Sequence, residues 1–525
     1  MSMKKAFAYF IVFAAAVCAF SQTSPVDYYY IADFDAVQGT VTFDKAEAYS
    51  ISPDEIIQPQ TPPDENSAIH LFLGNGYNYG GVSVGRVNMP SNVDMSVYSL
   101  ESTVSSEFWI RRNLTLVSDW IQTVSSDVKY SSSTSGARQL RFAVTDRGSK
   151  LAVGGNMELN TSKYFVTRVS NGRGSVASSG GVEFDIGGAL AFNFQGASDA
   201  EGYHIFDMRD SQSKTTGGDA MLLNLGGLSS SGKAVFMTAA TSATANFIFT
   251  DDDSGNFAGG SFEGIFAVDS SAPSSVNIYM NGSGRQSMSI YKSANAAAHG
   301  FGSDLDGMVD MAISSVSVNS GEFVLESELQ VQSIYLSGGS LKFSSPEKAN
   351  LIIIDGGRLV FGGTIKTADL AIGADSIEVV FSAEDLAANE IVVMEYNYCG
   401  ETLDPQKVFL ARGESGEDLG GMFEIIGESG SGYSLIYTVP EPAVSAAIFA
   451  GMAVLALLCR SRKKFKFAKI KNFSARGWHG INSRGGESIA LAADNHSLPV
   501  GYFWGRNFLL SERDFNPRIS EKTMR

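Results

Sequence analysis

The 525-residue chain is poor in charged residues, in proline and in cysteine. Only 18% of its residues are Asp, Glu, Lys or Arg, and only 13 are proline. This composition excludes a disordered acidic chain and a helical chain rich in Ala, Glu and Lys. Cys18 and Cys459 lie in apolar terminal segments, so Cys399 is alone in the body of the chain. No disulfide can cross-link that body, and packing and backbone hydrogen bonds must hold it together.

Positive charge is concentrated near the C-terminus. Residues 460–525 contain 14 Lys or Arg and 5 Asp or Glu, whereas residues 1–459 contain 25 and 51, a balance of −26. Because phosphate binding needs a basic surface, we exclude nucleic acid as a partner. The acidity favours a soluble exported body, or one that holds divalent cations.

The N-terminus has the pattern of an export signal. Lys4 and Lys5 precede an apolar run of 15 residues, and the small residues Ala19 and Ser21 suit cleavage after Ser21. We therefore predict a signal peptide over residues 1–21 that forms a helix and is removed. An N-terminal membrane anchor is the alternative.

A second apolar run lies near the other end. Residues 443–459 are 17 residues without charge, which as a helix would extend about 25 Å. A basic cluster follows, including Arg460, Arg462, Lys463 and Lys464. We predict a transmembrane helix over 443–459 with the body outside and the tail inside, because positive charge stays on the cytoplasmic side. A plain single-span anchor would have the same pattern.

The step before this run is more specific. Pro440 and Pro442 cannot continue a helix, and Glu441 resists entering hydrocarbon. The Pro-Glu-Pro step, the apolar run and the basic cluster together resemble the PEP-CTERM sorting signal of Gram-negative bacteria. In that family an exosortase in the inner membrane recognises the motif, and the substrate is cleaved and passed to the cell surface or to exopolysaccharide. The resemblance implies an exosortase-type partner, a transient inner-membrane stage and a final place at the surface or outside the cell.

A regular interval organises the body between residues 311 and 381. Gly321, Gly339 and Gly357 are 18 residues apart, and each is followed by a pair of apolar residues in alternate positions. These pairs are Phe323/Leu325, Leu341/Phe343 and Leu359/Phe361, and we expect the interval to continue to Ile377/Val379, where Asp375 replaces the glycine. A second set keeps the same step: Val316/Val318, Ile334/Leu336, Ile352/Ile354 and Leu370/Ile372.

Each unit thus has two short strands that cannot bury their apolar sides alone. Stacking of equivalent strands in parallel would bury them, so the predicted fold class is all-β: a parallel β-helix or β-solenoid with 18-residue rungs. An antiparallel sandwich also uses short strands, but it gives no reason for a constant interval. Weaker strand-rich stretches at residues 151–159, 179–196 and 244–268 resemble the Gly-rich β-helical passengers of bacterial autotransporters and related adhesins.

Five segments follow from these patterns. We predict a signal peptide (1–21), an aromatic N-terminal β-rich cap (22–122), a β-solenoid body (123–438), a sorting signal (439–464) and a basic, poorly ordered tail (465–525). The cap would cover the open end of the stacked strands.

Residue patterns for chemistry are sparse. His70, His204 and His299 lack metal-ligand spacing, and neither a G-x-S-x-G elbow nor a phosphate loop is present, so we predict no catalytic residues, cofactor or defined metal site. The acidic turn Asp251, Asp252 and Asp253 is a candidate for cation binding through carboxylate oxygens, although acidic turns are more often solvated loops. Trp109 and Trp120 could stack on sugar rings, but buried packing is the more common use of tryptophan.

The sequence therefore predicts a non-enzymatic, exported protein of the cell surface or extracellular matrix that acts as an adhesin or structural component. Its partners would be exopolysaccharide or a neighbouring cell. The alternative is a β-helical polysaccharide lyase or glycoside hydrolase, which would need carboxylates on both sides of the scissile bond. Fold analogy alone does not decide between them.

Overall fold

The structure is a computed structural model. It describes residues 26–30, 40–42, 46, 49–55, 57–60, 69–73, 86–88, 94–103, 107–110, 113–124, 140–144, 150–161, 164–170, 183–194, 203–210, 221–231, 233–238, 244–268, 275–301, 305, 308–399, 403–428 and 431–440. All of them belong to one compact unit, Met1–Ala443. The predicted signal peptide, transmembrane helix and basic tail lie outside the described residues.

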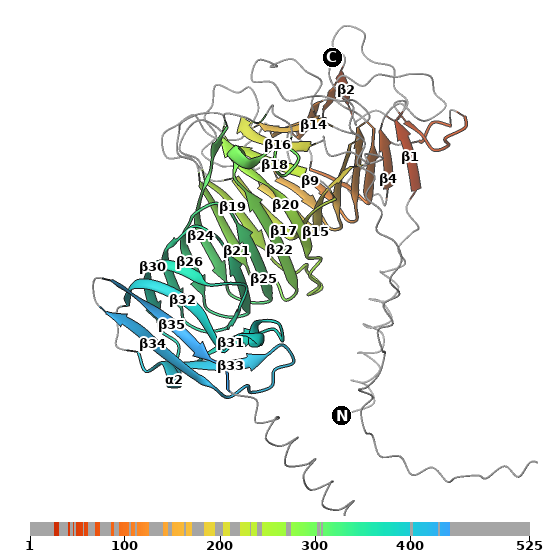
Figure 1. Ribbon diagram of the computed structural model, residues 1–525. Coiled ribbons are helices and arrows are strands. Elements are labelled where there is room, and N and C mark those ends of the chain that lie inside the picture. Colours follow the sequence, from red (N-terminus) through yellow and green to blue (C-terminus); the bar gives the residue numbers. More distant parts are fainter. Residues whose placement is uncertain are drawn as a thin grey trace, which may run out of the picture. The chain divides into compact units, whose positions relative to one another are not determined.

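The described residues are mostly β-strand and form two long sheets, which we call sheet A and sheet B (Figure 1). Sheet A has 20 strands: β1 Val26–Tyr30, β3 Tyr49–Ser50, β4 Ile69–Leu73, β6 Met95–Val97, β7 Ser99–Ser102, β9 Leu114–Leu116, β10 Trp120–Val124, β12 Lys150–Val153, β13 Met157–Thr161, β15 Glu183–Phe194, β17 Met221–Ser230, β19 Thr244–Phe249, β21 Ser275–Met280, β24 Ala312–Val318, β26 Val331–Leu336, β28 Ala349–Ile354, β30 Ile365–Ile372, β32 Glu390–Cys399, β34 Met422–Glu428 and β35 Gly432–Thr438. Sheet B has 15: β2 Thr40–Thr42, β5 Arg86–Asn88, β8 Glu107–Ile110, β11 Leu140–Val144, β14 Tyr164–Ser170, β16 Tyr203–Asp210, β18 Lys233–Thr238, β20 Gly260–Val268, β22 Arg285–Tyr291, β23 Val309–Asp310, β25 Glu322–Ser327, β27 Ser340–Ser344, β29 Arg358–Val360, β31 Ile377–Phe381 and β33 Phe409–Gly413.

Helices are short. They are the 3-10 turns η2 Ser293–Asn295 and η4 Asp385–Ala387 and the single α-helical turn α2 Pro405–Val408. None of the helices in the described part of the chain is long and apolar enough to cross a membrane.

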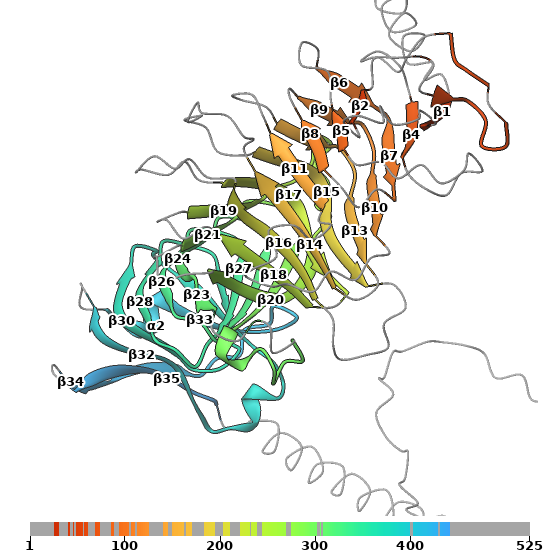
Figure 2. The same ribbon diagram turned by 90° about the horizontal axis from the view of Figure 1, so that it is seen from above.

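The pairing confirms the parallel arrangement that the 18-residue interval predicts. Phe323 on β25 lies beside Leu341 on β27, which lies beside Leu359 on β29. In sheet A the four strands β24, β26, β28 and β30 follow one another in the same way, each step 18 residues long. Figure 2 shows β19, β21, β24, β26, β28 and β30 in succession. Neighbouring strands thus place equivalent apolar residues side by side, which buries them.

The last predicted step is wrong by two residues. Leu359 pairs with Val379, not with Ile377, and the Phe361 ring lies 5.7 Å from that of Phe381. The three earlier corners turn through glycines with positive φ, 64°, 64° and 83° at positions 321, 339 and 357. Asp375 stands where the fourth glycine would be, and L-residues avoid that conformation. The chain makes this corner with two additional residues instead.

Upstream, the spacing of residues 151–159 has a different outcome from that of its counterpart. β26 and β27 belong to different sheets, whereas β12 and β13 both belong to sheet A and pair with the two halves of β15. The bend between β12 and β13 is Gly154-Gly155, whose N–H groups donate to the carbonyls of Leu116 and Ser118. Sheet A therefore continues through this bend. The steps here are also longer, for example 37 residues from Trp120 to Met157.

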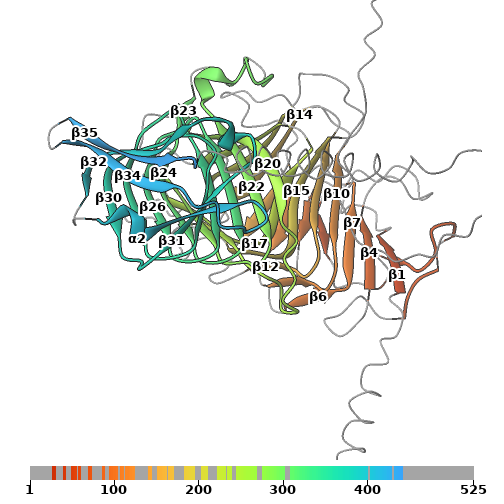
Figure 3. The same cartoon turned by 60° about the horizontal axis from the view of Figure 1, so that its bottom comes forward.

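The segment predicted as a cap continues both sheets. β10 pairs in parallel with β13, and β8 pairs in parallel with β11. Figure 3 shows β1, β4, β7 and β10 in succession before β15. The boundary predicted after residue 122 falls inside β10.

Among the described strands, antiparallel pairs occur at both ends of sheet A. β3 pairs with β1, and β35 pairs with both β32 and β34. An antiparallel strand breaks the repeat of equivalent parallel edges, which is one way to stop a sheet from adding further copies.

The core is aromatic along much of its length. Phe206, Phe236 and Phe266 lie on successive strands of sheet B, with ring centroids 5.5 Å and 5.7 Å apart. Trp120 from sheet A is fully buried, as predicted, and lies 5.3 Å from the ring of Phe108. The side chain of Trp109 lies outside the described residues.

Candidate binding surfaces

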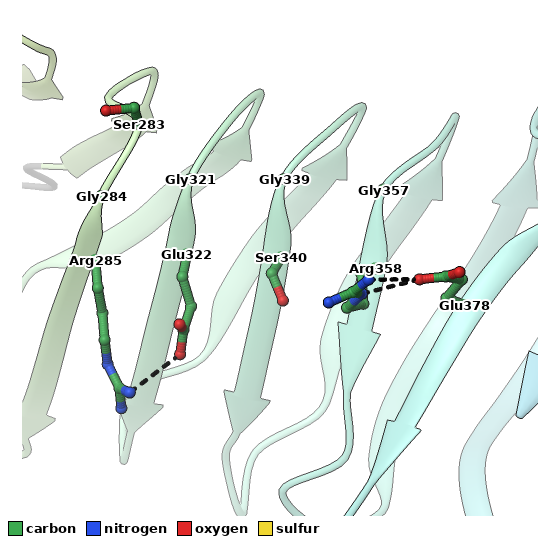
Figure 4. Close-up of a pocket in the computed structure, with 10 residues that line it drawn as sticks. All are labelled: Ser283, Gly284, Arg285, Gly321, Glu322, Gly339, Ser340, Gly357, Arg358 and Glu378. Atoms are coloured by element: carbon green, nitrogen blue, oxygen red, sulfur yellow. Dashed lines mark hydrogen bonds and ion pairs between the residues drawn. The ribbon is translucent and has the colours of Figure 1, made fainter. Parts of the chain in front are cut away.

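An open groove runs across five strands of sheet B, with a volume of about 680 Å³ (Figure 4). It is lined by Ser283, Gly284, Arg285, Gly321, Glu322, Gly339, Ser340, Gly357, Arg358 and Glu378. The corner glycines form its floor because neighbouring backbones approach closely there. A Cβ built on Gly339 would lie 2.5 Å from the carbonyl oxygen of Gly321.

Charged side chains of alternating sign line this groove, at the position after each corner glycine. Arg285, Glu322, Ser340, Arg358 and Glu378 are register partners on β22, β25, β27, β29 and β31. Arg285 Nη1 lies 3.3 Å from Glu322 Oε1, and Arg358 Nη2 lies 2.8 Å from Glu378 Oε2. Both arginine side chains remain substantially exposed, at 64% and 48%. The groove therefore offers hydrogen-bond donors and acceptors in a line, with no net charge from these four groups.

The sequence analysis missed this file. The signal was present as a polar residue after each corner glycine: Gly284-Arg285, Gly321-Glu322, Gly339-Ser340 and Gly357-Arg358. The first of these lies 37 residues before the second, so it falls outside the 18-residue interval.

The predicted acidic turn lines a second hollow, of about 740 Å³, together with Asp185 and Asn224. Asp251 accepts hydrogen bonds from the N–H and hydroxyl of Ser283, at 2.7 Å and 3.0 Å. Asp252 accepts from the N–H groups of Asn256 and Ser254, each at 2.8 Å. Hydrogen bonds from Asn256 are the main cause that lowers the pKa of Asp252.

Asp251 and Asp252 thus hold their own turn and the neighbouring one. Across the described ranges, no group of three or more His, Cys, Asp or Glu side chains is placed to hold a metal ion. Cation binding at Asp251, Asp252 and Asp253 stays a prediction.

The three histidines of the body lie apart. His70 on β4 contacts the Ser99 hydroxyl, and His204 on β16 is fully buried, with Nε2 2.9 Å from the Thr167 hydroxyl. His299 lies after η2, in the segment 293–308. Phe301 in that segment packs in a second apolar cluster with residues of β14, β16, β18 and β20.

His299 belongs to a polar cluster at the surface. Its Nε2 lies 3.0 Å from Glu328 Oε1, and its ring stacks on Tyr291 with centroids 3.7 Å apart. The Tyr291 hydroxyl donates to Glu263, and this bond together with burial, the larger cause, raises the pKa of Tyr291.

Glu328 in this cluster also accepts from the Lys292 N–H and the Asn295 amide, both at 2.9 Å. Burial is the largest single influence on the pKa of Glu328 and raises it, but the hydrogen bonds from Lys292, Asn295 and His299 outweigh it and lower the pKa. Glu328 therefore fastens the segment 293–308 to β22 and its neighbours.

Comparison of the chain with models of protein families, with curated proteins and with solved structures finds no match. Of the predicted sorting and cleavage residues, the structure describes only Pro440, two residues after β35. Those outside the described residues are Ala19, Ser21, Glu441, Pro442, Arg460, Arg462, Lys463 and Lys464.

Proposed function

We propose that the two sheets are sides of a parallel β-solenoid. The support is that the chain visits the sheets repeatedly and that each strand pairs with its counterpart in the next unit, as β25, β27 and β29 do. The main cluster of buried apolar residues contains side chains from both sheets, so the inward faces share one core. Units of this kind depend on their neighbours for burial.

On this fold we propose an exported surface or matrix protein that acts as an adhesin or structural component. The observation that carries the proposal is the file Arg285–Glu322–Ser340–Arg358–Glu378, which repeats exposed polar groups strand by strand. Because neighbouring strands are about 4.8 Å apart, a rigid line of such groups suits an extended polymer or a neighbouring cell surface. The partners are exopolysaccharide or a cell surface, with an exosortase-type enzyme in sorting.

Binding by the full-length protein, purified in a mild detergent, tests this function. The protein is expected to be retained by polysaccharide or by cells, and Arg358→Ala with Glu322→Ala should weaken the retention. Lys407→Ala is the matched control, because Lys407 also forms an exposed ion pair, with Asp404, away from the groove. Equal loss in the control, or no retention of the unsubstituted protein, would contradict the proposal.

Sorting is tested separately by intact-mass measurement of the surface form. Cleavage near Pro442 is the expected outcome for an exosortase substrate. A surface form that retains its full C-terminus would instead indicate a plain membrane anchor.

The second candidate is a polysaccharide lyase or hydrolase, and one observation favours it. Glu263, Tyr291, His299 and Glu328 join a phenol, an imidazole and two carboxylates in one cluster. Such groups serve in general acid–base catalysis. Turnover of acidic or neutral polysaccharide that His299→Ala abolishes would establish this function in place of the structural one.

A further inference from the structure

Six consecutive strands of sheet A contain no charged residue. These are β17, β19, β21, β24, β26 and β28, which read MLLNLGGLSS, TANFIF, SVNIYM, AISSVSV, VQSIYL and ANLIII. They lie side by side in parallel. Their neighbours at either end, β15 and β30, carry charge again, at Asp185 and Lys366 for example.

Sheet B differs along the same part of the chain. Every strand of sheet B from β18 to β33 has at least one charged residue, including Lys233, Glu263, Arg285, Lys342 and Arg412. Scarce charge in the chain as a whole therefore does not explain the neutral strands. The lack of charge belongs to one face.

Two files of side chains occupy the outer face of these strands. In one, the Asn277 amide donates to Asn246 at 2.9 Å, and the Ser315 hydroxyl donates to Asn277 at 2.8 Å. The other file includes Tyr279 and Tyr335, the latter 37% exposed. The alternate residues, such as Ile278 and Ile334, are buried in the core, so both files point outward.

We propose that this neutral face binds an uncharged, hydroxyl-rich polysaccharide chain that runs across the strands. Amides and hydroxyls provide both donors and acceptors for sugar hydroxyls, and tyrosine rings present flat apolar faces for sugar C–H groups. Tyr279 and Tyr335 are two strands apart, about 9.6 Å, which is close to the length of two sugar rings in an extended chain. The inference rests on the proposed function, since it names the ligand class of that surface protein.

Charge decides against the other occupants. A polyanion would find no cation on this face and would meet a body whose charge balance over residues 1–459 is −26. A charged peptide would likewise leave its charges unpaired. A second copy of the chain could also cover a neutral face, and self-association is therefore one outcome of the test.

The test is affinity electrophoresis of the full-length protein in detergent, with hydroxyethylcellulose as the neutral polymer and alginate as the acidic one. Retention by hydroxyethylcellulose is expected, little changed by 0.5 M salt as a probe of charge–charge attraction. The double variant Tyr279→Ala/Tyr335→Ala should bind at least about tenfold more weakly. Tyr398→Ala is the control, because Tyr398 is an exposed tyrosine of sheet A beside Asp369, outside the neutral strands.

Several results would overturn the inference. One is equal retention of the double variant and the unsubstituted protein while circular dichroism shows both folded. Another is a dimer that forms without polysaccharide and is lost in the double variant. Retention by alginate alone, lost in Arg358→Ala, would overturn the neutral ligand yet support the proposed function, whereas binding to neither polymer and to no cells would overturn both.

Discussion

Trp120 and Phe142 meet edge to face across the two sheets, with ring centroids 5.3 Å apart and planes at 89°. Trp120 belongs to β10 of sheet A and Phe142 to β11 of sheet B, and both side chains are fully buried. The geometry is the favoured one for aromatic pairs. The inward faces of the two sheets are therefore in direct contact at this level.

Trp120→Ala should be among the most destabilising single substitutions in this part of the chain. Loss of a buried large aromatic side chain costs about 3–5 kcal/mol of unfolding free energy. Urea unfolding followed by circular dichroism measures the loss. Val117→Ala, at a residue that is 56% exposed, is the control and should change little; similar losses for both would contradict the packing described.

Substitution of two glycines should separate backbone conformation from crowding. Gly339 and Gly416 both have positive φ, 64° and 86°, but only Gly339 has backbone atoms close to the position of a Cβ. The left-handed conformation costs an L-residue about 1–2 kcal/mol. Gly416→Ala should lose about that much stability, and Gly339→Ala clearly more. Thermal unfolding of the two variants side by side decides, and equal midpoints would argue against stacked corners.

His204 should make stability depend on pH. Burial lowers the pKa of His204 to about 3, whereas the unfolded value is near 6.5. Between these values the unfolded chain binds a proton that the folded chain does not, so stability falls as pH decreases from about 6.5 toward 3. One such group contributes at most about 1.4 kcal/mol per pH unit. The measurement is the unfolding free energy of the unsubstituted protein and of His204→Gln at several pH values. A slope that is the same in both would show that other groups cause it.

The Arg358–Glu378 pair should contribute little to stability in spite of its short contacts. The arginine Nη2 and Nε lie 2.8 Å and 2.9 Å from Glu378 Oε2, but the two side chains are 48% and 35% exposed. Exposed pairs of this kind are worth about 0.2–1 kcal/mol. A double-mutant cycle with Arg358→Ala and Glu378→Ala measures the coupling, which should shrink further in high salt. A coupling well above that range would mean that the groove is less hydrated than its exposure indicates.

The interval of 18 residues predicted which apolar residues become neighbours, because equal segment lengths place equal positions side by side. Phe323, Leu341 and Leu359 follow that rule. Val379 departs from it because the corner before it lacks a glycine. Trp120 could be assigned to the core from its residue type alone.

The polar sites were less accessible to sequence reasoning. Arg285 pairs with Glu322 across 37 residues, and Lys292 contacts Glu347 across 55. Neither distance is a repeat of 18, because the intervening connections differ in length. No local pattern signals such a pair, so only the paired register identifies it.

By itself, the sequence determined the type of element, the direction of pairing and the apolar contacts between residues 311 and 372. Alternation of apolar and polar residues is a local property, and a constant interval transfers it from one unit to the next. The tertiary structure decided which side chains form the charged file of sheet B and the neutral face of sheet A. Those sets come from strands separated by connections of unequal length, so their members become neighbours only when the strands pair.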